Sequence, residues 1–381
     1  MPRPHIIVCG DIVQTGGQDR ALYALARHML DTGNELHVVA HRIADDLAAC
    51  PNMQFHRVRK PANSYMLGYP LIDWNARRLA RVMADRRPGI LVNGGNCKTP
   101  AVNWVHYVHA AWNRRSESRM RTLRLRMHGM LSRHDERVAL GMARHIVANS
   151  NVTRRDLVER LGIPEQRISV IYYSADPAIF RPPTPAEREA ARRTLELTPE
   201  DCAIGFVGAL NDNRKGFDNL LEGFHLACQA WNGRPLRLLA AGRGGETEHW
   251  QRSIRERGLE GRVRFLGFRS DIVRVLHGLD AMAAPSRYEA YGLVPHEAVA
   301  CGLPAIVTRI TGFAERMQAF LPDLLLDSPD DPQEMASAIR RLADDLPRYA
   351  DLARQCAEHL ALHSWDDMAR QISQLMEDHA G

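Results

Sequence analysis

Apolar residues follow two alternating patterns along the first half of the chain. The apolar run His5–Cys9 predicts a buried strand. The stretch 19–32 then carries apolar residues at the spacing of one helical face, and Gly33 ends it. Further apolar runs predict strands at 36–40, 90–93, 104–108, 145–148 and 167–171. Strands that alternate with helices favour a parallel sheet covered by helices.

A proline-rich stretch, 177–185, separates this series from a second one. The second series has apolar runs that predict strands at 203–207, 236–240, 263–266, 281–284 and 305–308. Two such series predict an α/β fold with two doubly wound, Rossmann-like parallel-sheet domains facing a central cleft. We expect the domains to span 1–178 and 179–363, followed by a final helix over 364–381 with Ser364 as its N-cap.

Length and composition fit this two-domain interpretation. The chain has 381 residues, of which 45% are hydrophobic and 25% charged, as in soluble globular proteins. No apolar run approaches the roughly 18 residues of a membrane span, and the first residues lack a signal-peptide core. We therefore expect a protein of the cytoplasm or of the inner membrane face. The seven cysteines form no C-x-x-C pair, and no metal site is expected.

Charge is distributed unevenly between the two halves. Residues 1–180 hold 26 Lys and Arg against 15 Asp and Glu, whereas residues 181–381 hold 24 against 30. The basic half indicates an anionic partner, such as a phospholipid surface, a lipid-phosphate acceptor or an acidic glycan, or else a solvated face. Residues 114–144 carry nine arginines against three acids and one apolar helical stripe, a pattern found both at anionic membranes and on solvated helices.

The segment 287–308 carries the strongest functional signal. Its glutamates, Glu289 and Glu297, stand eight positions apart on either side of Gly292 and Pro295. We predict a strand end, a tight loop, a short helix and another strand. No Ser, Thr, Asp or Asn between 290 and 294 is available as an N-cap, so the first helical amides need another partner, and a phosphate would suit them.

This segment resembles the Glu-x7-Glu motif of the retaining GT-B glycosyltransferases of the GT4 type. The resemblance includes the Gly-Leu-Pro at 302–304 and the Pro-Ser at 285–286. It implies that the first domain binds an acceptor, that the second binds a nucleoside-diphosphate sugar, and that the final helix returns to the first domain. The implied donor-binding residues in the motif are Glu289, Ala290, Tyr291, Gly292, Leu293 and Glu297, with Glu289 also catalytic.

A second motif precedes a predicted helix start near residue 217. Arg214 and Lys215 can reach anionic oxygens beside that helix, although an isolated pair of this kind could equally be a surface pair. The pair resembles the element with which the family grips the donor diphosphate. The family often has an arginine just after the preceding glycine, where this chain has Ala209, and Arg243 is the candidate replacement.

Three further positions match the family less specifically. Gly16 and Gly17 stand in the loop after the first strand, where the family brings backbone near the donor, although such a pair can be a simple turn. His109 best matches the family's catalytic histidine, with His106 as the fallback and a buried structural histidine as the alternative. Phe268 lies in the loop that resembles the base-binding loop.

The resemblance implies transfer of a hexose-type sugar to a glycan, lipid-linked or small-molecule hydroxyl, with retention. The nucleotide sugar is a co-substrate, with UDP favoured over GDP, and no cofactor, metal or nucleic acid is expected. Two alternatives stay open: a GT-B epimerase or phosphorylase, and a non-catalytic protein that binds sugar nucleotides. Release of free sugar or sugar phosphate without an acceptor would distinguish the first of these.

Overall fold

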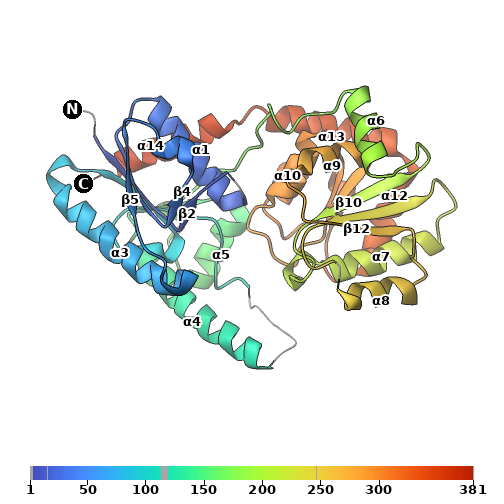
Figure 1. Cartoon of the computed structure of the whole chain (residues 1–381), viewed down its shortest axis with the longest axis horizontal. Coiled ribbons are helices and arrows are strands. Elements are labelled where there is room, and N and C mark those ends of the chain that lie inside the picture. The colour runs from blue at the N-terminus through green and yellow to red at the C-terminus, as the bar shows by residue number, and fades with distance from the viewer. Residues whose placement is uncertain (1–2, 15, 113–118, 246, 381) are drawn as a thin grey trace. The chain divides into compact units, whose positions relative to one another are not determined.

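The computed structural model describes residues 3–14, 16–112, 119–245 and 247–380, and it describes no side chain between 119 and 128. Residues 114–118 of the arginine-rich segment therefore lie outside the described part. The chain divides into two compact units, one made of residues 1–173 and 364–381 and the other of residues 174–363 (Figure 1). Each unit has its own sheet and core.

Unit 1 is built on a parallel sheet in the order β5-β3-β1-β6-β7-β8-β9. Its strands are β1 (His5–Val8), β3 (Leu36–Ala40), β5 (Met53–Arg57), β6 (Gly89–Asn93), β7 (Val102–Val105), β8 (His145–Ala148) and β9 (Ile168–Val170). A short parallel pair joins β2 (Asp11–Ile12) to β4 (Arg42–Ile43). The interior strand β1 is fully buried, with Ile6, Ile7 and Val8 all 0% exposed, as expected for a parallel sheet covered on both faces.

The helices of unit 1 include α14, which comes from the far end of the chain. They are α1 (Gly17–Asp31), α2 (Asp45–Ala48), α3 (Tyr65–Val82), α4 (Arg119–Met142), α5 (Asn151–Leu161) and α14 (Trp365–Asp378), with 3₁₀ turns η1 (Pro61–Asn63), η2 (Ala84–Arg86), η3 (Gly94–Asn96) and η4 (Glu165–Arg167). Helix α14 packs against α1. A capping box between Ser364 and Asp367 begins α14.

Unit 2 is built on a parallel sheet in the order β12-β11-β10-β13-β14-β15. Its strands are β10 (Cys202–Val207), β11 (Leu236–Ala241), β12 (Val263–Gly267), β13 (Ala281–Ala284), β14 (Ala305–Thr308) and β15 (Leu325–Leu326). Its helices are α6 (Pro185–Thr194), α7 (Phe217–Gln229), α8 (Glu248–Glu256), α9 (Ile272–Gly278), α10 (Leu293–Ala300), α11 (Ala314–Met317), α12 (Pro332–Asp344) and α13 (Leu346–Leu360), with 3₁₀ turns η5 (Asn213–Lys215) and η6 (Pro322–Leu324). The predicted α/β fold with two doubly wound parallel sheets is confirmed.

One predicted strand is displaced. The sequence predicts a strand over 104–108, whereas β7 spans Val102–Val105 and ends before both histidines. The backbone turns after β7, where the amide of Ala111 bonds the carbonyl of Val108 at 3.0 Å. His106 and His109 therefore lie in a connecting loop and not within the predicted strand.

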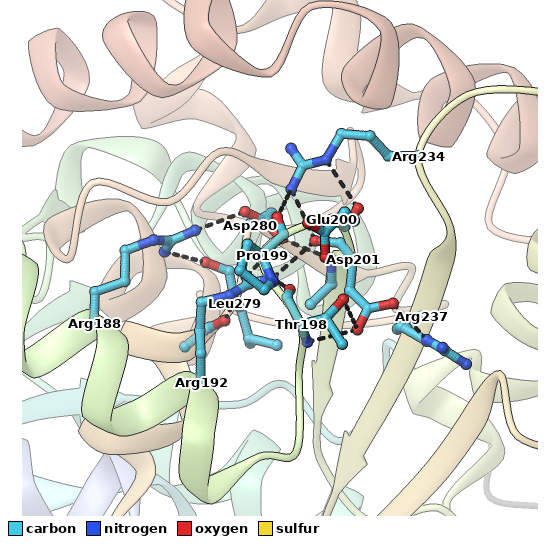
Figure 2. A network of polar contacts seen from close by, with 12 residues as sticks. Arg188, Arg192, Thr198, Pro199, Glu200, Asp201, Arg234, Arg237, Leu279 and Asp280 are labelled. Carbon is cyan, nitrogen blue, oxygen red and sulfur yellow. Dashed lines mark hydrogen bonds and ion pairs between the residues drawn. The ribbon is translucent and has the colours of Figure 1, made fainter.

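A network of arginines and carboxylates closes the amino edge of the unit 2 sheet (Figure 2). Asp280, just before β13, accepts hydrogen bonds from Arg188 at 2.6 Å and from Arg192 at 3.1 Å, and both arginines lie on α6. Asp201, just before β10, accepts from Arg237 at 2.7 Å. Burial would raise the pKa of Asp201, but bonds from Thr198 and Arg237 outweigh it and hold the pKa below its usual value. This network fastens α6 to the sheet at the edge away from the loops described next.

Within the described ranges, we find no helix with both the length and the apolarity needed to cross a membrane.

Candidate donor-binding site

The predicted donor residues of unit 2 gather where the strand order of its sheet reverses. Strands β10 and β13 are neighbours at the centre, and the chain continues outward from them on opposite sides. Ligands of open parallel sheets bind beside the carboxyl ends of the strands at such a switch point. The loop after β10 carries Arg214 and Lys215, and the loop after β13 carries Glu289, so the fold brings the two motifs together.

Two cations from the first loop converge on one carboxylate of the second. Lys215 Nζ donates to Glu289 Oε2, and Arg214 Nη1 donates to the same oxygen at 3.2 Å. Arg214 Nη1 also bonds the carbonyl of Tyr288 at 3.1 Å, and its Nε bonds Asp212 at 3.3 Å. Burial would raise the pKa of Glu289, but Lys215 and Arg214 outweigh it, so the pKa is lowered and the carboxylate stays ionised.

The turn that presents these cations is held by Gly216 and by Arg287. Gly216 has a φ of 70°, and a Cβ at this position would stand 2.0 Å from the carbonyl oxygen of Pro285, so only glycine fits. Arg287 bonds the Asn213 carbonyl at 2.6 Å through its guanidinium and the Arg214 carbonyl at 2.8 Å through its amide. Sequence reasoning missed the role of Arg287, because the two carbonyls that it binds lie more than 70 residues away along the chain.

Helix α10 begins beside this cluster without a side-chain cap. Its N-cap is Gly292, with φ 102°, and no side chain caps the first amides. Pro295 in the first turn has no N–H, so Leu293 and Val294 supply the first helical amides. Glu297 lies within the helix and is 4% exposed. The helix start offers amides and a positive dipole end, which together favour an anion.

The loop from Glu289 to Gly292 rests on a buried layer that the sequence did not reveal. Ala290 and Tyr291 are 3% and 2% exposed, and the Tyr291 hydroxyl bonds His296 Nδ1 at 2.9 Å. His296 stacks on Phe313 at 5.0 Å, and burial lowers the pKa of His296 to about 3, so it is neutral at physiological pH. These buried contacts hold the loop 289–292 in place from the side of the core.

Arg243 and Phe268 lie at the carboxyl ends of β11 and β12, on the same edge of the sheet. The Arg243 guanidinium stacks over the Phe268 ring at 5.0 Å, and that ring is 67% exposed. The Leu210 amide bonds the Arg243 carbonyl at 2.9 Å, which brings the backbone of Arg243 next to Ala209. Arg243 is thus a neighbour of the position where the family often carries an arginine.

The predicted residues of unit 1 lie at the carboxyl edge of its own sheet. Gly16, with φ 87°, is the N-cap of α1, and Gly17 is its first residue. His109 is partly exposed, and its amide donates to both carboxylate oxygens of Glu136 at 3.1 Å. His106 is 8% exposed and bonds the Tyr173 hydroxyl, and burial lowers its pKa to about 3. His109 is therefore the more accessible of the two histidines.

Family models match both units. The model described as Glycosyltransferase Family 4 matches residues 15–178, and the model described as Glycosyl transferases group 1 matches residues 201–345. The D-inositol 3-phosphate glycosyltransferase of Corynebacterium urealyticum is 32% identical over 237 residues, which are 60% of this chain and 55% of the relative. The enzyme of that name from Rhodococcus erythropolis is 30% identical over 59% of this chain and 51% of the relative. The chain thus spans about half the length of the curated relatives it matches.

Solved structures share the fold across nearly the whole chain. WaaG, a glycosyltransferase involved in lipopolysaccharide biosynthesis, superposes with a TM-score of 0.74 at 16% identity, covering 97% of this chain and 99% of WaaG. Anabaena HepE, solved in complex with UDP and glucose, gives a TM-score of 0.70 at 18% identity over 98% and 100% of the two chains.

The two parallel-sheet units have the GT-B fold of these solved structures. The chain belongs to the GT4-type glycosyltransferases, as the two family models together account for most of its length.

Proposed function

We propose that the protein transfers a hexose from a nucleoside-diphosphate sugar to an acceptor hydroxyl and retains the anomeric configuration. The observation that carries the proposal is the convergence of Arg214 and Lys215 on Glu289 at the switch point, beside the uncapped start of α10. This arrangement provides two fixed cations and a helix dipole for a diphosphate, and one carboxylate for sugar hydroxyls.

In the proposed reaction, the bond between the anomeric carbon and the β-phosphate oxygen breaks, and a bond to the acceptor oxygen forms on the same face. The acceptor proton passes to the leaving phosphate. Arg214 and Lys215 stabilise the charge that grows on that phosphate, because their positions are set before the reaction by Gly216 and Arg287. His109 is proposed to contact the transferred sugar, and Glu297 the ribose.

The nucleotide and the acceptor are proposed from the comparisons. HepE has been solved with UDP, which makes a UDP-sugar the first donor to test. The curated relatives carry the name D-inositol 3-phosphate glycosyltransferase, and the basic first half of this chain suits a phosphorylated polyol. D-inositol 3-phosphate is therefore the first acceptor to test.

The deciding experiment measures nucleoside-diphosphate release from UDP-, GDP- and ADP-glucose with and without the acceptor, and determines the anomeric configuration of the product by NMR. Release that depends on the acceptor, with an α-linked product from an α-linked donor, supports the proposal. Lys215→Ala should lower kcat/KM by a factor equivalent to roughly 2–4 kcal/mol, while the exposed control Arg255→Ala retains activity. Sugar release without an acceptor, or equal activity in the folded Lys215→Ala variant, contradicts it.

A further inference from the structure

Helix α3 of unit 1 has apolar residues on two separate faces. One face packs on the sheet through Gly68, Ile72 and Ala76, which are all buried. The other face carries Leu67, Leu71, Trp74 and Val82, spaced by four, three and eight residues, so that they form one stripe along the helix. We call these four residues the α3 stripe. A surface helix normally needs only its inner apolar face.

The α3 stripe is open to solvent in the described structure. Leu67 is 49% exposed, Trp74 is 52% exposed and Val82 is 75% exposed. With Tyr65, Met66 and Leu71, this one helix supplies six of the thirteen large hydrophobic side chains that are exposed among the described residues. Scattered exposed apolar residues are ordinary, but their concentration on one helix marks an interaction surface.

The surroundings of the stripe are basic. Arg78 lies in the stripe, and its guanidinium stacks over the Trp74 ring at 5.5 Å. Residues 74–87 contain five arginines and one acid, Asp85. Asp73, on the flank of the helix, is already bonded by Arg77 at 2.7 Å and by the Lys98 amide at 2.8 Å. Arg86 is likewise paired with Glu35 at 2.6 Å. The surface therefore combines apolar anchors with a net positive charge that rests on Arg78, Arg81 and Arg87 against Asp85.

Helix α4, on the other side of η3, also has exposed apolar side chains. Helices α3 and α4 both contact η3, and Lys98 joins them through Asp73 and through Asp135, whose carboxylate is 2.7 Å from Lys98 Nζ. On α4, Met130 is 67% exposed and Leu131 is 56% exposed. The apolar and basic surface is thus not confined to a single helix.

We infer that the α3 stripe docks unit 1 onto the surface of an anionic phospholipid bilayer. Leucine and tryptophan side chains enter the interfacial layer, while the arginines reach the lipid phosphates, as in helices that lie in the plane of a membrane. A second copy of the chain fits this surface less well, because a two-fold interface brings together two surfaces of the same basic charge, whereas an anionic bilayer offers the opposite charge. The inference does not rest on the proposed transferase activity.

The experiment is sedimentation of the full chain with vesicles of pure phosphatidylcholine or of phosphatidylcholine with phosphatidylglycerol. Binding should require phosphatidylglycerol and weaken with added salt. Leu67→Ser/Leu71→Ser/Trp74→Ser should abolish it, and Arg78→Glu/Arg81→Glu should weaken it by about tenfold or more. These residues are exposed, so the fold should survive, which circular dichroism checks.

Matched substitutions of exposed residues in unit 2 are the controls. Ile179→Ser/Leu362→Ser and Arg193→Glu/Arg255→Glu should bind vesicles as the wild type does. Absence of sedimentation with phosphatidylglycerol vesicles at low salt overturns the inference, as does an equal loss in the control variants. Light scattering that shows a dimer, converted to a monomer by the triple serine variant, would also overturn it by assigning the surface to a second copy.

Discussion

At the scale of single residues, the carboxylate of Glu289 is contacted by two cationic side chains. Both Arg214 and Lys215 contact its Oε2 atom, and the pKa of Glu289 is lowered by them against the effect of burial. A nucleoside diphosphate that uses the same cations must therefore compete with this carboxylate. We therefore expect Glu289 to influence donor binding in addition to its proposed contact with the sugar.

We expect Glu289→Gln to separate these two effects. The neutral amide keeps the size of the side chain but removes the charge that Lys215 and Arg214 share, and Arg214 keeps its bond to Asp212, so free UDP should bind as tightly as to the wild type or several-fold more tightly. Sugar transfer should nevertheless fall by at least about a hundredfold. Calorimetric titration with UDP and a transfer assay measure the two effects. Weaker UDP binding in the folded variant would show that Glu289 supports the diphosphate site instead.

Glu136 provides a test of pH dependence in unit 1. It is 1% exposed, and burial raises its pKa to about 7 despite the hydrogen bond from the His109 amide. Between pH 4.5 and 7 the folded state keeps a proton that the unfolded state releases, so this group makes the free energy of unfolding fall as pH rises, by roughly 3 kcal/mol in total.

Glu136→Gln should remove that contribution, since the amide oxygen still accepts from His109 and does not titrate. The variant should gain stability over the wild type as pH rises from about 5 to about 8, as measured by chemical denaturation. The exposed Glu248→Gln serves as the control and should follow the wild type at every pH. Parallel curves for Glu136→Gln and the wild type would contradict the raised pKa.

At the scale of elements, the sequence predicts strands more reliably than the loops and helices between them. The strands at 36–40, 145–148, 281–284 and 305–308 have their predicted bounds, because each is a short apolar run between polar or turn-forming residues. The strand at 104–108 is displaced, since the apolar run continues beyond β7 into a loop held by Glu136. No helix is predicted at α3, where Gly68 and Pro70 interrupt the pattern.

The candidate site shows the same limit. Arg214, Lys215 and Glu289 could be selected from local motifs, and the fold brings them into contact. Arg287, His296 and Phe313 could not, because their importance depends on contacts with the turn at 213–216 and with the loop at 289–292. The local sequence motif identifies the residues of a loop that can bind a ligand, whereas the residues that hold the loop in place come from distant parts of the chain.

Substitution of Gly216 tests whether the tight turn between η5 and α7 positions the two cations. In Gly216→Ala the new Cβ would meet the Pro285 carbonyl at 2.0 Å, so the turn carrying Arg214 and Lys215 must shift. We expect a loss of stability clearly above the roughly 1–2 kcal/mol of left-handed strain alone, and at least about tenfold weaker UDP binding. Gly258→Ala is the matched control, because Gly258 has φ 62° but no atom lies within 4 Å of the place that a Cβ would take. Equal effects of the two substitutions would show that steric contact at Gly216 does not position the site.

At the scale of the whole molecule, the two units share one architecture but carry different functional residues. In each, the first strand is an interior strand of a parallel sheet, and the loops at the carboxyl edge carry the predicted functional residues. In unit 2 the opposite edge is closed by the arginine network around Asp201 and Asp280, which leaves the carboxyl edge for ligands. The proposed division of labour gives the donor to unit 2 and the acceptor to unit 1.

Hydrogen exchange with separate ligands tests this division. UDP alone should slow amide exchange in residues 209–217 and 287–297 of unit 2, because bound anions contact these amides and restrict local opening. Adding D-inositol 3-phosphate should extend protection to the loops that follow β1 and β7 in unit 1. Residues 198–203, at the amino edge, should exchange unchanged and serve as an internal reference, and Lys215→Ala should lose the UDP effect. Protection by UDP that appears in unit 1 and not in unit 2 would reverse the assignment of donor and acceptor.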